Sequence, residues 1–223
     1  MKKKYYEAYN ERYKTIHKKG FSWSSDISTP IVLETIKKLN LSKEDGILEI
    51  GCGEGRDAKA ILEQGYNLLA TDISIEAINY CKAMMPAFTD HFAILDCLND
   101  KSAKKYRFIF AVAVIHMLVL DEDRQQFYEF IHDHLENDGF ALICSMGNGE
   151  METKTDIDEA FSLKKREHHS GEVEVAATSC RMVSFKTMEK EISDAGLLIV
   201  DKGITSSLPD FNSLMFAVVK IDR

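Results

Sequence analysis

Residues 47–57 read Ile-Leu-Glu-Ile-Gly-Cys-Gly-Glu-Gly-Arg-Asp, and they form the strongest local pattern in the sequence. Its first four residues predict a short buried strand, and the alternate glycines Gly51, Gly53 and Gly55 predict a sharp turn into a helix. Glycine lets the backbone approach a ligand with no side chain in the way, and the helix N-terminus presents free N–H groups to an anion. Asp57 is a candidate N-cap of that helix, and a contact with the ligand is an equal alternative. The stretch therefore predicts a strand–turn–helix unit that binds a ligand.

From residue 47 onward, apolar strands alternate with helical segments. The sequence predicts strands at 47–50, 67–71, 91–95, 108–115 and 139–145, and helices at 57–64, 74–84 and 122–135. Strands this apolar, separated by helices, are typical of a parallel sheet whose two faces are both covered. The fold class that we expect is therefore α/β.

The end of the chain breaks this alternation. A helix at 186–195 is followed by two strand-like runs, 197–205 and 213–221, which are joined by a turn around Pro209. So short a link cannot carry a crossover helix. The last strand should therefore run antiparallel to its neighbour.

Two segments lie outside the alternating core. A helix is expected at 5–17, where four tyrosines recur at helical spacing, and we interpret these tyrosines as packing residues. They are Tyr5, Tyr6, Tyr9 and Tyr13. Residues 147–184 fit neither pattern, and an insertion of this length is usually a functional loop or cover. We therefore expect one domain, made of N-terminal helices (1–40), a binding core (46–146), a substrate-covering insertion (147–184), and a terminal helix with an antiparallel strand pair (186–223).

The composition of the 223 residues is that of a soluble globular domain with a formal net charge of −8. This charge disfavours a nucleic-acid backbone or an anionic membrane as the main partner. The most apolar stretch, residues 108–120, is too short to span a bilayer. The five cysteines form no CxxC pair and no complete disulfide framework, so we expect reduced thiols in a cytoplasmic protein. The oligomeric state stays open.

Acidic residues stand at the ends of the two strands that follow the glycine turn. Asp72 closes the second strand, and Asp96 follows the third beside Cys97. Strand ends meet at the carboxyl edge of a parallel sheet, where a carboxylate can accept hydrogen bonds from ribose hydroxyls. The dinucleotide fingerprint needs a third glycine where this chain has Arg56, so the pattern here is GxGxG instead.

With a glycine turn and two acids at three consecutive strand ends, residues 30–146 resemble the class I S-adenosylmethionine-dependent methyltransferases. The resemblance implies a Rossmann-like, doubly wound sheet of seven strands, mostly parallel with an antiparallel last strand, and helices on both faces. It implies S-adenosylmethionine as the cofactor and S-adenosylhomocysteine as the product. The run 54–58 is also similar to that of thiopurine- and tellurite-type methyltransferases, which act on small molecules.

The resemblance also implies roles for individual residues. The residues that would hold the methionine part of the cofactor are Glu49, Gly51, Cys52, Gly53 and Gly55. Asp72 with Ile73 would bind the ribose, and Asp96 with Cys97 would lie near the adenine. The fourth strand lacks the acid and the polar residue that family members often carry. The cofactor's amino group would then depend on a backbone carbonyl, that of Ala111.

His116 follows the fourth strand, near the place where family members hold the substrate. It is a candidate general base, or else a histidine packed at a strand end, because transfer to a soft nucleophile needs positioning rather than a base. Phe21 and Trp23 are candidates for a lid over the cofactor, or for an anchor of the N-terminal helix. His168 and His169 lack the spacing of metal ligands, so we expect no metal.

The sequence therefore predicts a methyltransferase that acts on an oxygen, nitrogen or sulfur atom of a small molecule. Nicotinamide-dependent oxidoreductases use a similar sheet, but Arg56 and the antiparallel last strand pair count against that class. A non-catalytic module that binds the cofactor stays open, because the fourth strand offers no catalytic side chain.

Overall fold

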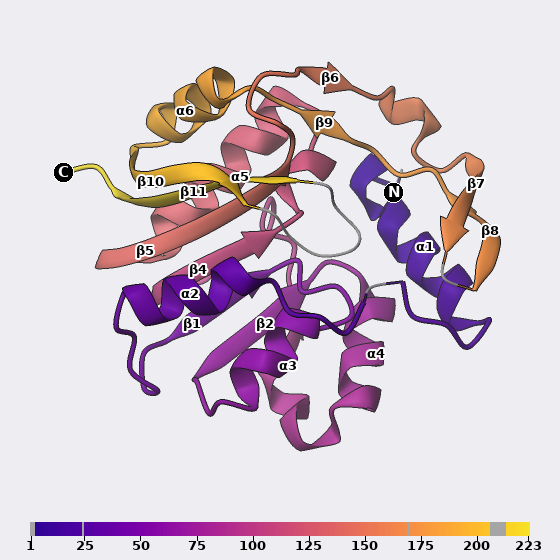
Figure 1. The fold of residues 1–223 in the computed structure, drawn as a ribbon, viewed down its shortest axis with the longest axis horizontal. Helices are drawn as coiled ribbons and strands as arrows, with labels where there is room; N and C mark the ends of the chain where they lie inside the picture. The colour runs from indigo at the N-terminus through magenta and orange to yellow at the C-terminus, as the bar shows by residue number, and fades with distance from the viewer. Residues whose placement is uncertain (1–2, 24, 169, 206–212) are drawn as a thin grey trace.

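The computed structural model describes residues 3–23, 25–168, 170–205 and 213–223, and a seven-stranded sheet forms its centre (Figure 1). The strand order is β10-β11-β5-β4-β1-β2-β3. From one edge of the sheet to the other, the strands are β10 (Leu197–Thr205), β11 (Leu214–Ile221), β5 (Leu135–Met146), β4 (Tyr106–Val112), β1 (Ile47–Ile50), β2 (Leu68–Asp72) and β3 (Phe92–Ile94). Each of these strands overlaps one that the sequence predicts.

The directions of the strands confirm the predicted fold class. β1 to β5 are parallel to one another, whereas β11 is antiparallel to both of its neighbours, β5 and β10. β11 is thus inserted between two strands that run the other way. The turn predicted around Pro209, which would join β10 to β11, lies outside the described residues.

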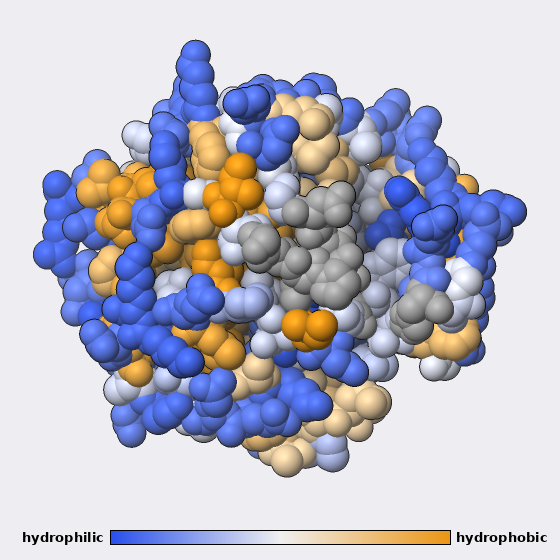
Figure 2. Space-filling view, in the orientation of Figure 1, coloured by the Kyte–Doolittle hydropathy of each residue, from blue (hydrophilic) through white to orange (hydrophobic). Residues whose placement is uncertain are grey.

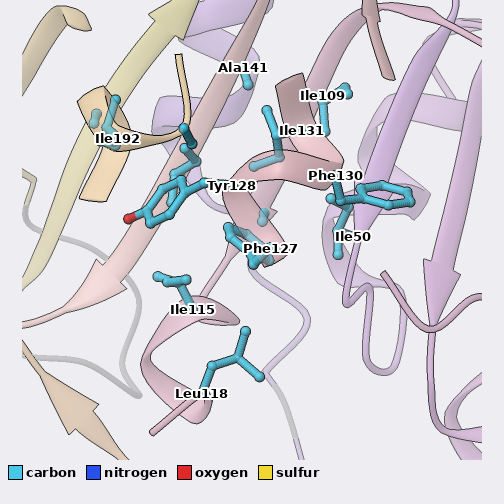
Figure 3. Close-up of a cluster of buried hydrophobic side chains, with 14 of the residues drawn as sticks. Ile50, Ile109, Ile115, Leu118, Phe127, Tyr128, Phe130, Ile131, Ala141 and Ile192 are labelled. Atoms are coloured by element: carbon cyan, nitrogen blue, oxygen red, sulfur yellow. The ribbon is translucent and has the colours of Figure 1, made fainter. Parts of the chain in front are cut away.

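Helices cover both faces of the sheet. On one face lie α2 (Pro30–Lys38), α3 (Arg56–Leu62) and α4 (Ile75–Met84), and on the other lie α5 (Asp121–His134) and α6 (Phe185–Asp194). Successive strand residues point to opposite faces, so Ile47 packs in the first core and Leu48 in the second. Figure 3 shows the second core, where Phe127 and Tyr128 of α5 lie among aliphatic side chains of the sheet and α6.

The prediction that Asp57 caps α3 is wrong. Gly55 occupies the N-cap position with a left-handed backbone (φ +79°), and Asp57 lies in the first turn of the helix. The Asp57 carboxylate accepts hydrogen bonds from the backbone N–H and, at 2.8 Å, from the hydroxyl of Thr29. Because Thr29 is the N-cap of α2, Asp57 fixes the start of one helix against the start of the other.

The insertion between β5 and α6 folds into two small antiparallel pairs. These are β6 (Thr153–Lys154) with β9 (Arg181–Met182), and the hairpin of β7 (Leu163–His168) and β8 (Gly171–Ala176). The N-terminal helix α1 (Ala8–His17), which follows the short helix η1 (Tyr5–Glu7), packs against β8 (Figure 1). The two segments that lie outside the alternating core therefore meet on one side of the molecule. The remaining short helices are η2 (Pro86–His91), η3 (Ile115–Met117) and η4 (Ile157–Glu159).

The edge strand β10 exposes the apolar side chains of Leu198, Val200 and Ile204, and Figure 2 shows hydrophobic residues gathered over this part of the molecule. Charged residues interrupt the apolar run. Asp201 pairs with Lys38 of α2, and Lys202 pairs with a glutamate of α6. Charges of this kind commonly protect edge strands from pairing with another chain.

None of the helices in the described ranges has the length and the apolar character needed to cross a membrane.

Arg124 of α5 is almost fully buried and ties together three elements. Its guanidinium forms a two-pronged ion pair with Glu191 of α6, at 2.7 Å from Nε to Oε1 and 2.6 Å from Nη2 to Oε2. Its Nη1 also donates to the carbonyl oxygen of Ile115 at 2.8 Å. Because Ile115 begins η3, shortly after β4, this cluster fixes the chain at the carboxyl edge of the sheet.

We expect Arg124→Ala to lower the free energy of unfolding by about 3–5 kcal/mol, because the largely buried Glu191 carboxylate loses its partner. Urea denaturation followed by circular dichroism measures the loss. The control Lys190→Ala removes the exposed ion pair with Asp194 on α6, and it should cost less than about 1 kcal/mol. Equal losses in the two variants would show that Arg124 is no anchor.

Candidate functional site

The carboxyl ends of β1, β2, β3 and β4 border a cavity of about 80 Å³, which the N-terminal helices cover. The side chains and backbone that line it come from Tyr6, Tyr9, Tyr13, Ile50, Gly51, Asp72, Ile73, Leu95, Asp96, Cys97, Leu98, Val114, Met117 and Leu118. Pockets for small molecules usually measure roughly 300–1,000 Å³. The cavity beneath the N-terminal segment is smaller than this range.

Five residues assigned from the sequence line this cavity. They are Gly51, Asp72, Ile73, Asp96 and Cys97. The other assigned residues, Glu49, Cys52, Gly53, Gly55 and Ala111, stand behind them in the turn and in the strands. The structure thus brings three consecutive strand ends to one cavity, and it divides the assigned residues into a lining set and a supporting set.

The side chains of Val114 and Tyr13 pack closely against the glycine turn. Gly51 has φ +72°, and a Cβ at this position would lie 2.4 Å from Cγ2 of Val114. Gly53 has φ +55°, and a Cβ there would lie 2.8 Å from the hydroxyl oxygen of Tyr13. Both the backbone conformation and the space therefore require glycine.

Asp72 supports the turn and lines the cavity at the same time. Its Oδ2 accepts a hydrogen bond from the backbone N–H of Gly53 at 2.9 Å, and its Oδ1 accepts one from Ser74 N–H at 2.8 Å. Burial raises the pKa of Asp72, while these backbone donors favour the ionised form. The carboxylate is thus held in a fixed orientation by the chain itself.

Glu49 lies on β1 behind the turn and is buried. Its Oε2 has no hydrogen-bond partner within the described part of the chain. Burial raises the pKa of Glu49 well above its usual value, and the nearby Asp57 carboxylate raises it further. A positive charge at the turn would favour the ionised form of this carboxyl group.

The N-terminal segment runs along the carboxyl edge and meets each strand end in turn. Lys4 Nζ lies 3.3 Å from the Asp96 carboxylate, Asn10 Oδ1 accepts from the Ser74 hydroxyl at 2.8 Å, and His17 Nε2 lies 2.8 Å from Glu54 Oε1. Three tyrosines of this segment line the cavity, at 6, 9 and 13. Tyr6 packs in the core as predicted, and all three tyrosines also face the cavity, which the sequence did not indicate. Their spacing of three and four residues places them on one helix face, but only the position of that helix reveals what the face contacts.

Arg12 joins the N-terminal helix to the insertion. Its buried guanidinium donates to the carbonyl oxygens of Ala176 and Ala177 at 2.9 Å each, and to the Thr178 hydroxyl at 2.8 Å. The guanidinium also lies over the Trp23 ring, 4.7 Å from its centroid. Burial lowers the pKa of Arg12, and the several oxygen acceptors offset part of the cost of burying the charge.

Trp23 and Phe21 lie between α1 and the β7–β8 hairpin, outside the cavity lining. The Trp23 ring stacks on His168 at a centroid distance of 5.7 Å, and its backbone N–H donates to Glu54 Oε1 at 2.8 Å. Phe21 contacts the same histidine ring at 5.9 Å. These contacts are those of an anchor, and they leave the predicted role in a lid untested.

The candidate histidines lie in very different surroundings. His116 on η3 is buried and is not among the residues that line the cavity. Burial, followed by the charges of Arg124 and Arg12, lowers the pKa of His116 to about 3, so its ring is neutral at pH 7. Both ring nitrogens of His168 make hydrogen bonds, to Ser170 and to a backbone carbonyl. His169 lies outside the described residues, and within the ranges that are described no group of three His, Cys, Asp or Glu could hold a metal ion.

The central part of the chain is similar to a known family. Residues 48–141 match a family model described as a methyltransferase domain. No curated protein matches the sequence.

Solved structures resemble the chain over most of its length. An S-adenosylmethionine-dependent methyltransferase from Clostridium acetobutylicum is 17% identical, with a TM-score of 0.66 over 98% of this chain and 99% of that chain. The CcbJ methyltransferase of Streptomyces caelestis is 13% identical, with a TM-score of 0.71 over 96% and 99%. The 1,6-didemethyltoxoflavin-N1-methyltransferase of Burkholderia thailandensis is 14% identical, with a TM-score of 0.64 over 87% and 77%. At these identities the likeness shows the fold.

We expect Gly51→Ala to destabilise the protein more than Gly65→Ala, although both glycines have a left-handed backbone (φ +72° and +80°). A Cβ at Gly65 meets nothing within 4 Å, so only the backbone strain of about 1–2 kcal/mol applies there. The clash with Val114 should add about 1–3 kcal/mol at Gly51. Urea denaturation compares the two variants. Equal losses would show that the turn has room for a side chain.

Proposed function

We propose that this chain, which carries a methyltransferase domain in the class I methyltransferase fold, uses S-adenosylmethionine to methylate a small molecule. The observation that carries the proposal is the meeting of Gly51, Asp72 and Asp96, from three consecutive strand ends, at one cavity. In open α/β sheets, ligands bind in the crevice outside the carboxyl ends of the strands. Two acids and a glycine turn at that edge suit a ligand with a ribose, an adenine and an amino-acid end.

The residues at this edge fit the cofactor. A carboxylate has about four lone-pair sites, and the Asp72 carboxylate uses two of them for backbone donors. The remaining sites can accept the two ribose hydroxyls. The Glu49 carboxyl behind the turn, whose Oε2 has no partner among the described residues, suits a cationic group at the methionine end. Asp96 and Cys97 lie at the end of the cavity that would hold the adenine. The Lys4 ammonium contacts the Asp96 carboxylate, and it would have to move away when the adenine binds there.

The acceptor would lie beneath the cover that α1 and the insertion form together. The cofactor's sulfonium supplies a methyl group that is already activated for displacement. The task of the chain is then to hold an oxygen, nitrogen or sulfur nucleophile in line with that methyl group and to exclude water. The Arg12 contacts with residues 176–178 support a cover that acts as one body. The net charge of −8 favours a small molecule over a nucleic acid.

The free cysteines indicate the cell compartment in which the protein works. All five are free, including the buried pair Cys52 and Cys81 at the turn. Reduced thiols are typical of cytoplasmic proteins, and we infer that the reaction takes place in the cytoplasm.

Transfer of a labelled methyl group tests the proposed reaction. The protein is incubated with S-adenosylmethionine labelled in its methyl group and with panels of small phenols, amines and thiols. We expect label in one of these classes and release of S-adenosylhomocysteine. Binding of the cofactor with no transfer to any panel would favour a non-catalytic module. Oxidation or reduction with a nicotinamide cofactor would favour the oxidoreductase, although Arg56 stands where that class needs a third glycine.

We expect Asp72→Asn to weaken the affinity for S-adenosylhomocysteine by about 10–100-fold, because the ribose loses a charged acceptor. Isothermal titration calorimetry measures the affinity. The control Asp156→Asn alters a carboxylate that accepts a backbone N–H two residues ahead, as Asp72 does, but it lies exposed on the insertion. Its affinity should equal that of the wild type. Unchanged affinity in Asp72→Asn would contradict the assignment of the ribose site.

His116 stays the candidate base for a nucleophile that must lose a proton. With a pKa of about 3 the imidazole is unprotonated at every working pH, but it is a weak base. We therefore expect His116→Asn to lower kcat by no more than about tenfold, and no ionisation of this residue in the pH–rate profile above pH 5. A full general base contributes roughly 10²–10⁴ in rate. A loss in that range, with rescue by added imidazole, would show that His116 is such a base.

A further inference from the structure

The ring of Tyr13 on α1 lies over the glycine turn and lines the cavity. Its hydroxyl oxygen is 2.8 Å from the point that a Cβ on Gly53 would occupy, so it is in direct contact with the turn. The ring stacks on His17 at a centroid distance of 5.8 Å. His17 in turn stacks on Tyr80 and makes a hydrogen bond with Glu54. The orientation of the Tyr13 ring is therefore fixed from outside the cavity.

The Tyr13 hydroxyl has no hydrogen bond within the part of the chain that is described. Burial, and then the negative charges of Asp72 and Glu54, raise the pKa of Tyr13 well above its usual value. The hydroxyl is therefore protonated at neutral pH and can donate as well as accept. Tyr13 is partly buried and lines the cavity, so its hydroxyl is available to a ligand that enters there.

We propose that the Tyr13 hydroxyl binds the amino-acid end of the cofactor, through the carboxylate or the ammonium group, and so positions that end on the glycine turn. The inference rests on the proposed function, and it adds a residue from the N-terminal helix to a site that the strand ends otherwise form. Tyr13 is the polar side chain of α1 that reaches Gly53, and the turn is where the methionine part is expected.

Tyr6 marks the other end of the cavity and supplies a matched control. Its hydroxyl lies 3.5 Å from the Asn99 amide nitrogen, and its ring lies under the Lys4 ammonium beside Asp96. Tyr6 therefore borders the adenine end, whereas Tyr13 borders the glycine turn. Removing each hydroxyl in turn separates the two ends of the ligand.

The test compares two ligands that differ only at the amino-acid end. S-adenosylhomocysteine carries that end, and 5′-methylthioadenosine keeps the adenosine and the sulfur but lacks it. We expect Tyr13→Phe to weaken S-adenosylhomocysteine about 10-fold or more and methylthioadenosine less than twofold, as judged by calorimetry. Tyr6→Phe should change both affinities by the same factor. Phenylalanine keeps the ring packing, and an unchanged thermal midpoint confirms that the fold is intact.

The opposite results are equally clear. Equal losses for the two ligands in Tyr13→Phe, or no loss at all, would overturn the proposal. Tighter binding of S-adenosylhomocysteine would overturn it too, because the hydroxyl would then occupy the place of the amino-acid end. If the wild-type protein binds neither ligand, the proposed function itself fails, and this outcome is distinct from a failure of the Tyr13 assignment.

Discussion

The backbone N–H of Gly53 donates to the Asp72 carboxylate across 2.9 Å, and this bond couples the turn after β1 to the end of β2. The parallel pairing of the two strands brings the partners together, since Cys52 N–H continues the ladder to Thr71. The left-handed glycines then let the turn pass close to the carboxylate. A single constraint thus orients both the acid and the turn. The rest of the cavity is arranged around them, and a side chain at position 51 would have to displace Val114.

The cover of this site is built from parts of the chain that are distant in sequence. α1 packs on β8, and Arg12 fastens the two by donating to backbone oxygens at the end of the hairpin. Ala113, directly after β4, and Thr178, after β8, both have a left-handed backbone without being glycine. Strain of this kind, about 1–3 kcal/mol for each residue, persists only where the surroundings hold it, and it clusters at functional sites. The N-terminal segment thus forms one side of the cavity at the carboxyl edge.

The sequence predicts the sheet and the strand ends because these depend on local patterns. The periodicity and the apolar character of the residues locate the strands. In a parallel sheet the carboxyl ends of the strands share one edge, so Asp72 and Asp96 could be placed together. The tyrosines at 6, 9 and 13 could not be assigned, since a helix face has the same pattern whether it meets a core or a cavity. Asp57 was misassigned for a related reason. An acid in a first turn resembles a cap, and only the packing of α2 on α3 reveals Thr29 as its partner.

The central claim is that this carboxyl edge binds an adenosyl amino acid and not a dinucleotide. Titration of the purified protein with S-adenosylmethionine, S-adenosylhomocysteine and NADH in the calorimeter tests it most directly. We expect binding of the first two ligands in the micromolar range and no heat from NADH. Binding of NADH alone would mean that the turn at Gly51–Gly55 holds a pyrophosphate and that the site belongs to a dinucleotide.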